Sequence, residues 1–204
     1  MPVKAIAINC SLKKSSGETS STDAMIALLK EQFAAHEVEV TETVRIADYN
    51  VLPGVTSDEG EGDDWPELRE KILAHDILIF GGPIWMGQIG SIAKRVLERM
   101  DAFLGETDEK GRMPSSGKVA VAAIVGNEDG AHWSSAQLFQ SLNDTGWTIP
   151  AVAACYWVGE AMGSVDFKEL DETPDKTIET AKMVATNASH LAKLLQGNPY
   201  PGTA

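Results

Sequence analysis

Short apolar segments alternate with longer amphipathic segments along the chain, and this alternation constrains the fold more than any other feature. The apolar segments have the length of buried strands, and the amphipathic segments carry apolar residues at helical spacing. The expected strands are Val3–Ile8, Val38–Ile46, Asp76–Phe80, Lys118–Val125 and Thr148–Ala153. The expected helices are Thr22–Ala35, Pro66–Ala74, Ser91–Phe103, Trp133–Asp144 and Thr173–Leu195. This order predicts a parallel sheet that is covered by helices on both faces.

Right-handed crossovers leave few topologies for such a chain. We predict an α/β protein, a flavodoxin-like three-layer α/β/α sandwich with a five-stranded parallel sheet of order 2-1-3-4-5. The length of 204 residues suits a single domain over 1–204, with a frayed tail from about residue 197. In such sheets ligands bind beyond the carboxyl ends of the strands, where the strand order reverses. The loops after Ile8, Phe80 and Val125 are therefore the expected site.

The charge balance restricts the partners. Lys and Arg number 17 against 30 Asp and Glu, a formal net charge of −13. Such a chain lacks the basic surface that nucleic acids require, and it is poorly suited to anionic membranes. Its apolar runs are shorter than the roughly 20 residues that span a bilayer, and its start does not resemble a signal peptide. We therefore expect a cytoplasmic protein without membrane insertion.

The loop after the first strand, residues 9–22, is rich in Ser and Thr hydroxyls and contains Lys13 and Lys14. It leads into a helix, whose first N–H groups attract anions. Phosphate binding is the favoured interpretation; the alternative is that Ser20, Ser21 or Thr22 serves only as an N-cap. The loop has neither the Walker A spacing nor a Gly-x-Gly-x-x-Gly turn.

Two further loops follow the third and fourth strands. Residues 81–90 are apolar and aromatic, and Trp85 and Met86 offer a flat, polarisable surface for a ring, although Trp85 alternatively packs beneath a helix. Residues 126–133 combine glycines with polar groups that can bond a ring edge, or they form a simple strand-to-helix turn capped by Asp129. Together the three loops predict a site for a phosphorylated aromatic ligand.

These loops carry a resemblance to a known family. Ser11-Leu12-Lys13 with Ser20-Ser21-Thr22 resembles the phosphate loop of the flavodoxin-like NAD(P)H-dependent FMN reductases. The segment 81–87 (Gly-Gly-Pro-Ile-Trp-Met-Gly) is similar to the family's Pro-x-Tyr/Trp-x-Gly loop, and 126–130 stands where the third flavin loop is placed. The chain departs from the family pattern in having Cys10 for Gly and Leu12 for Pro.

The resemblance implies FMN as cofactor and NADPH or NADH as electron donor. It implies that the following residues bind FMN: Ser11, Lys13, Ser20, Ser21, Thr22, Pro83, Ile84, Trp85, Met86, Gly87, Gly126, Asn127, Glu128 and Gly130. Electrons would pass to a quinone, a flavin or another small-molecule acceptor, and the flavin would carry the chemistry without a catalytic acid, base or nucleophile from the protein. It also implies a homodimer or homotetramer.

Two other functions stay open at this point: a flavodoxin-like FMN electron carrier without NAD(P)H activity, and a flavin-free signalling or structural protein on the same fold.

Several other features carry less weight. Cys10 and Cys155 are expected to be reduced and buried. A Cys10 phosphatase nucleophile is disfavoured because its loop has no Arg. The four histidines lack metal-ligand spacing, with His132 alone beside a predicted loop. The acidic run 58–64 is interpreted as a solvated, mobile loop, and segment 156–164 as lining a pocket, a subunit contact or packing beneath the last helix.

Overall fold

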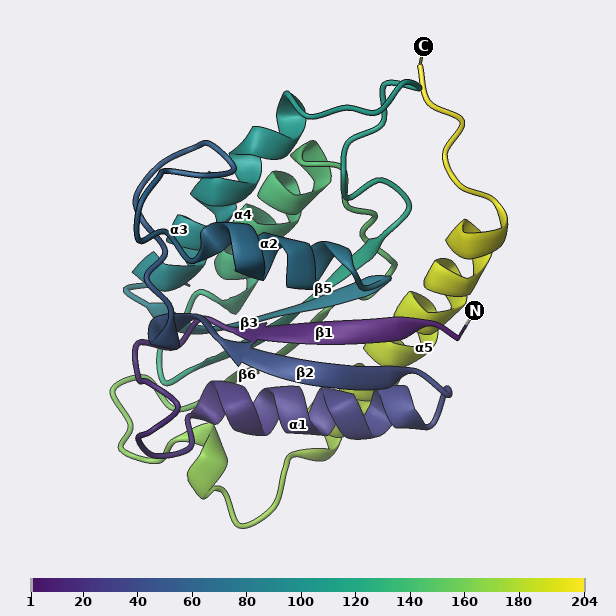
Figure 1. The fold of residues 1–204 in the computed structure, drawn as a ribbon. Coiled ribbons are helices and arrows are strands. Elements are labelled where there is room, and N and C mark those ends of the chain that lie inside the picture. Colours follow the sequence, from purple (N-terminus) through teal and green to yellow (C-terminus); the bar gives the residue numbers. More distant parts are fainter. Residues whose placement is uncertain (1, 204) are drawn as a thin grey trace.

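The computed structural model of the protein describes residues 2–203 and places a twisted sheet between two layers of helices (Figure 1). The strands are β1 Lys4–Asn9, β2 Glu39–Arg45, β3 Ile77–Trp85, β4 Gln88–Ile89, β5 Val119–Gly126 and β6 Ala154–Val158. The α-helices are α1 Ser21–Ala34, α2 Trp65–Leu73, α3 Ser91–Met100, α4 Ala131–Asp144 and α5 Asp175–Gly197. Short 3₁₀ helices are η1 Ile46–Asp48, η2 Asp101–Leu104 and η3 Phe167–Glu169.

The sheet has the order β2-β1-β3-β5-β6, and all neighbours in this series are parallel. The short β4 pairs antiparallel with the end of β3 and lies off this series. Counted along the chain without β4, the parallel strands follow the order 2-1-3-4-5. The predicted flavodoxin-like fold is therefore confirmed.

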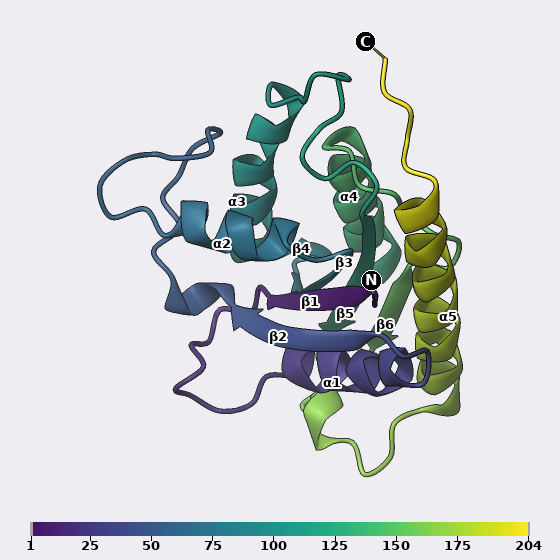
Figure 2. The ribbon, with the colours of Figure 1, turned by 45° about the vertical axis from the view of Figure 1, so that its right-hand side comes forward.

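Alternate residues along the strands point to opposite faces of the sheet and pack into two separate hydrophobic cores. Ala5, Ala7 and Ile79 lie in the core under α1 and α5, whereas Ile8 and Phe80 face the core under α2, α3 and α4. Figure 2 shows these two helical layers on opposite faces of the sheet. Because the central strands are buried on both faces, they are apolar throughout rather than alternating.

The third strand is longer than expected. It continues from Phe80 through the predicted loop to Trp85, turns at Met86 and Gly87, and returns as β4. Both turn residues have positive φ, 53° at Met86 and 74° at Gly87, as in a type I′ hairpin turn. The apolar segment 81–85 is thus strand rather than loop, and it carries the aromatic side chain beyond the edge of the parallel sheet.

The fifth parallel strand was predicted at Thr148–Ala153, but it lies about one strand length later in the chain, so this prediction is wrong. Thr148 makes only an isolated bridge to Val119, and the paired strand is Ala154–Val158. Pro150 has no N–H to donate to a ladder, and Val152 has a left-handed φ of 54°. The chain therefore bends before it joins the sheet, and segment 156–164 begins inside β6.

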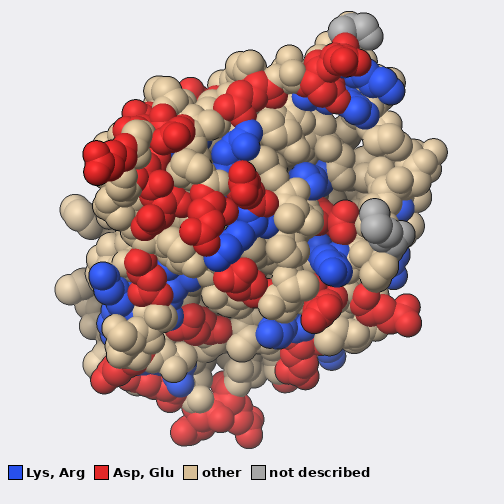
Figure 3. All heavy atoms as spheres, viewed as in Figure 1, with Lys and Arg blue, Asp and Glu red and all other residues tan. Residues whose placement is uncertain are grey.

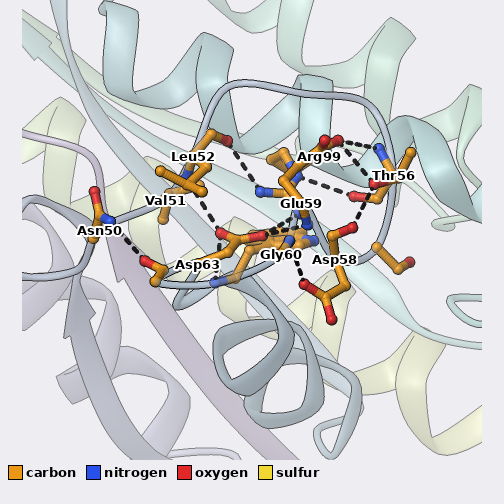
Figure 4. Close-up of polar contacts among 12 residues, drawn as sticks. Asn50, Val51, Leu52, Thr56, Asp58, Glu59, Gly60, Asp63 and Arg99 are labelled. Atoms are coloured by element: carbon orange, nitrogen blue, oxygen red, sulfur yellow. Dashed lines mark hydrogen bonds and ion pairs between the residues drawn. The ribbon is translucent and has the colours of Figure 1, made fainter.

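The acidic loop 50–64 is anchored to α3 through Asp63, while Asp58 and Glu61 in the same run are exposed as expected. Asp63 pairs with Arg99 of α3 at 2.7 Å, and both side chains are fully buried (Figure 4). Arg99 also donates to the carbonyls of Leu52 and Thr56 at 3.0 Å. Burial opposes ionisation of Asp63, but Arg99 and three backbone N–H groups outweigh it and hold its pKa well below the usual range. The interpretation of this run as solvated is wrong for Asp63.

After α5 the chain crosses the loop 105–117. The Tyr200 hydroxyl lies 3.1 Å from the Thr148 hydroxyl, and the Thr203 N–H donates to the Lys110 carbonyl at 2.9 Å. Residue 204, the end of the expected frayed tail, lies outside the described residues, as does residue 1. Within residues 2–203, every helix is too short or too polar to cross a bilayer.

Candidate functional site

A cavity of about 750 Å³ opens at the carboxyl edge of the sheet. Its walls come from the loop after β1, the start of α1, the β3–β4 hairpin, the end of β5 and the segment from β6 to η3. The lining residues are Ser11, Leu12, Lys13, Ser20, Ser21, Thr22, Pro83, Ile84, Trp85, Met86, Val125, Gly126, Asn127, Glu128, Trp157, Met162, Asp166, Phe167 and Lys168. The volume lies within the range of pockets that hold one cofactor-sized ligand.

The structure brings the three predicted loops together around this one cavity. All the predicted site residues line it except Gly87 and Gly130. These two glycines lie directly behind the wall: Gly130 has a φ of 125°, and a Cβ on it would lie 2.4 Å from the Gly87 carbonyl oxygen. Their contribution is close approach of two backbones rather than contact with the cavity.

The hydroxyl-rich end of the cavity is formed by the loop after β1 and the first residues of α1. Ser20 is the N-cap of α1 and forms a capping box with Asp23, so capping accounts for the Ser20 side chain. Ser11 is different, because it is 5% exposed and its hydroxyl has no hydrogen-bond partner among residues 2–203. A buried hydroxyl without a partner at a cavity wall is suited to a ligand.

A polar network beneath this loop fixes its course. Asn9 at the end of β1 accepts the Ser11 N–H at 2.9 Å and donates to Ser20 and Asp23. Arg45 at the end of β2 pairs with Asp23 and donates to the Lys13 carbonyl at 2.6 Å. Burial opposes ionisation of Asp23, but Ser20 and Arg45 outweigh it and lower its pKa. Asn9 and Arg45 thereby hold the loop from below, although neither lines the cavity.

The opposite wall is the β3–β4 hairpin, which carries Trp85 and Met86. The Glu128 carboxylate accepts the N–H groups of Met86 and Gly87, each at 2.9 Å. Glu128 follows β5, so this pair of bonds ties the hairpin to the neighbouring strand's loop. Its carboxylate is therefore a support for the aromatic wall as well as a lining group.

The segment after β6 closes the third side of the cavity. Trp157 packs against Phe167 with ring centroids 5.5 Å apart. The Asn127 amide donates to Asp166 at 3.0 Å, while its own side-chain oxygen is buried and has no partner among the described residues. These contacts bring η3 to the end of β5 and to the start of α1.

Only part of this segment was predicted from the sequence to line a pocket. It singled out 156–164 as a possible pocket wall, and Trp157 and Met162 do line the cavity. Asp166, Phe167 and Lys168 were missed. The available signal was Pro150, which has no N–H for the ladder and argues against an unbroken strand over Thr148–Ala153, so that the strand and the loop after it move toward these residues.

The cysteines and His132 stay outside the site. Cys10 and Cys155 are unpaired and buried, as expected. Burial raises the pKa of the Cys155 thiol to about 12 and raises that of Cys10 as well. His132 lies 3.0 Å from the Tyr156 hydroxyl and is not among the lining residues.

Fold and cavity together define a flavodoxin-like protein with a cavity at the carboxyl edge of its sheet. The sequence model of the NADPH-dependent FMN reductase family matches residues 3–161. The chain belongs to this family.

Two curated proteins and one solved structure show further similarity. The 8-demethyl-8-aminoriboflavin-5'-phosphate synthase of Streptomyces davaonensis is 33% identical over 215 residues, which cover 98% of this chain and 81% of that protein. The divalent metal cation transporter MntH of Mycobacterium bovis is 33% identical over 201 residues, 95% of this chain. The chain spans only 29% of the length of that transporter.

The solved structure is RosB with the bound intermediate 8-demethyl-8-formylriboflavin-5'-phosphate. It has a TM-score of 0.87 and 30% identity, and the match covers 98% of this chain and 82% of RosB.

Proposed function

We propose that the protein is an FMN-dependent oxidoreductase that takes electrons from NADPH or NADH and passes them to a quinone, a flavin or another small acceptor. The observation that carries this proposal is the single cavity with a hydroxyl-rich helix start at one end and an aromatic hairpin at the other. Membership of the NADPH-dependent FMN reductase family supports it.

The residues present fit FMN. The unpartnered Ser11 hydroxyl and the start of α1 suit a phosphate, because a helix N-terminus offers N–H groups and a partial positive charge. The unpartnered Asn127 oxygen suits a polar edge of a ring system. Trp85 and Met86, which are 52% and 88% exposed, leave apolar surface for a flat ring to cover.

In this arrangement Ser11, Lys13, Ser21 and Thr22 would hold the phosphate, and Ser20, whose N–H and hydroxyl both donate to Asp23, would cap the helix start beneath it. The hairpin residues 83–86 would support the ring, and Gly126, Asn127 and Glu128 would lie at its edge, while Gly87 and Gly130 allow the two backbones behind this wall to approach closely. Bound FMN supplies the electron transfer chemistry. The protein binds and orients it, and the apolar walls exclude water from one side of the ring.

The exposed apolar side chains at the cavity mouth, Met86 and Met162 among them, support a homodimer or homotetramer as the working form. Sedimentation velocity tests this: a species of one chain mass at micromolar concentration would contradict it.

A second candidate function has its own observation. The similarity to an aminoriboflavin-phosphate synthase and to RosB, over most of each protein, supports a flavin phosphate that is chemically changed in this cavity as a substrate. The electron carrier is a third reading of the same cavity, in which FMN binds but NAD(P)H does not react.

One experiment separates the reductase from the carrier, and its mass readout detects a flavin that the protein changes. The protein is loaded with FMN, desalted, and mixed anaerobically with NADPH and, separately, with NADH, while the flavin absorbance is followed. We expect bleaching by one or both nucleotides, and recovery of flavin of unchanged mass after reoxidation. Retained flavin without bleaching supports the carrier, altered mass supports the modifying enzyme, and absence of retained or titratable flavin contradicts the proposal.

A further inference from the structure

A phosphate bound at the hydroxyl-rich end of the cavity would need a nearby positive charge in an otherwise acidic protein. The chain has a net charge of −13, and a phosphate monoester carries close to two negative charges at pH 7. Figure 3 shows acidic side chains spread over the face drawn, with basic ones between them. Arg45, whose guanidinium donates to the Lys13 carbonyl beneath the loop, is already paired with Asp23. The cationic lining residues are Lys13 and Lys168.

Lys168 is placed firmly by its neighbours. It belongs to η3, whose N-terminus is stabilised by a capping box between Asp166 and Glu169. The preceding Phe167 is 5% exposed and packs on Trp157. The Lys168 backbone N–H points to the Ser21 hydroxyl at 3.4 Å, at the first residue of α1. The Lys168 ammonium lies 3.4 Å from Glu18, just before the start of α1, and it comes from the segment that follows the edge strand β6.

The ammonium group of Lys168 has a weak partner. It lies 3.4 Å from the Glu18 carboxylate, and Glu18 is 79% exposed whereas the Lys168 side chain is only 18% exposed. The Lys168 stem is mostly covered while its ammonium meets a solvated carboxylate at 3.4 Å, and such an exposed ion pair contributes little. A phosphate at the start of α1 is a stronger partner, because bonds between ionised groups are the strong ones.

A second observation points to an anion at the same place. The Ser11 hydroxyl is buried, lines the cavity and has no partner in the described part of the chain. Ser11, the start of α1 and Lys168 come from three separate segments and meet at one end of one cavity.

We propose that Lys168 is a specificity determinant that selects the phosphorylated flavin over riboflavin. This inference rests on the proposed FMN site and adds to it a residue outside the loop after β1. Lys168 binds the 5'-phosphate and neutralises part of its charge, and Glu18 gives up its contact when the phosphate enters. Riboflavin, which lacks the phosphate, gains nothing from Lys168.

The test compares dissociation constants for FMN and for riboflavin, measured by flavin fluorescence or absorbance titration. The variants are Lys168→Gln, Lys168→Arg and the control Lys176→Gln. Lys176 is also paired with a glutamate, Glu179 at 2.6 Å, but it is 90% exposed on α5 and does not line the cavity.

We expect K168Q to weaken FMN binding about tenfold, equivalent to about 1.4 kcal/mol, and to leave riboflavin binding unchanged. K168R retains FMN binding, and K176Q changes neither constant. The FMN dissociation constant also rises less steeply with added KCl in K168Q than in the wild type.

Two results overturn the inference while leaving the proposed function intact: FMN binding by K168Q within twofold of the wild type, or equal losses for FMN and riboflavin. Equal losses would show that Lys168 only supports the fold of the cavity. A wild-type protein that binds neither flavin refutes the proposed function, and the role of Lys168 with it.

Discussion

Glu128 joins the two walls that would hold the flavin ring, and its removal gives a quantitative prediction. Its carboxylate accepts two backbone N–H groups of the hairpin turn, both at 2.9 Å. A hydrogen bond to a charged group contributes about 1.5–3 kcal/mol. Because Glu128 is only half-buried, we expect a combined contribution of about 2–3 kcal/mol. With 1.4 kcal/mol per factor of ten, this limits the loss of affinity to about 30- to 150-fold.

The change is Glu128→Ala, and the assay is titration with FMN and with riboflavin. We expect both dissociation constants to rise by the same factor, roughly ten- to a hundredfold, because the hairpin supports the ring and the ring is common to both ligands. This response differs from that of K168Q, which affects FMN alone.

Asp129→Ala is the matched control. Asp129 is the next residue, but within residues 2–203 its side chain accepts only the neighbouring Gly130 N–H, at 2.7 Å, and it does not line the cavity. The reasoning is refuted if E128A binds both flavins within threefold of the wild type, or if it loses affinity for FMN only. A urea unfolding curve on each variant shows that the measured proteins are folded.

Two further predictions concern stability and a third concerns flavin binding. Asp63→Asn leaves the buried Arg99 charge without its partner, and we expect it to lower the free energy of unfolding by about 3–5 kcal/mol. Urea unfolding at pH 7 measures this free energy, and a loss under about 1 kcal/mol would contradict the prediction. Because the folded-state pKa of Asp63 is lowered, its pairing stabilises the fold at neutral pH and is lost as the pH falls below about 4. The urea midpoint of the wild type should therefore fall more between pH 7 and pH 3.5 than that of D63N. Gly130→Ala forces a Cβ against Gly87, and we expect it to weaken binding of both flavins. The control is Gly117→Ala, which is also at positive φ but has open space around it and only strains its own backbone. Equal flavin affinities of these two variants would contradict the role given to the close approach of Gly130 and Gly87.

The fold was predictable because its strongest signals are local. β1 and β5 are apolar at nearly every position, and such strands require helices on both faces. The same rule predicted where the cavity lies, since parallel strands bring the loops after β1, β3 and β5 to one edge. Twelve predicted residues from these loops line one cavity although they span residues 11–128.

What the sequence did not reveal depends on backbone geometry and on distant pairs. The apolar segment 81–85 suits a loop against a ring as well as a strand, and only the positive φ at Met86 shows that a hairpin closes there. Misplacing the last strand hid η3, and with it Lys168. The pairs Arg45–Asp23 and Arg99–Asp63 join residues 22 and 36 positions apart, and charge spacing along one sequence does not indicate which charges meet.

The central claim is that the cavity at the carboxyl edge of the sheet holds FMN with its phosphate at the start of α1. A crystal structure of the FMN complex tests it most directly. The account predicts phosphate oxygens within hydrogen-bond distance of the Ser11 hydroxyl and the Lys168 ammonium, and the ring against Trp85. A flavin bound elsewhere on the chain, or one with its phosphate beside Glu128, would contradict it.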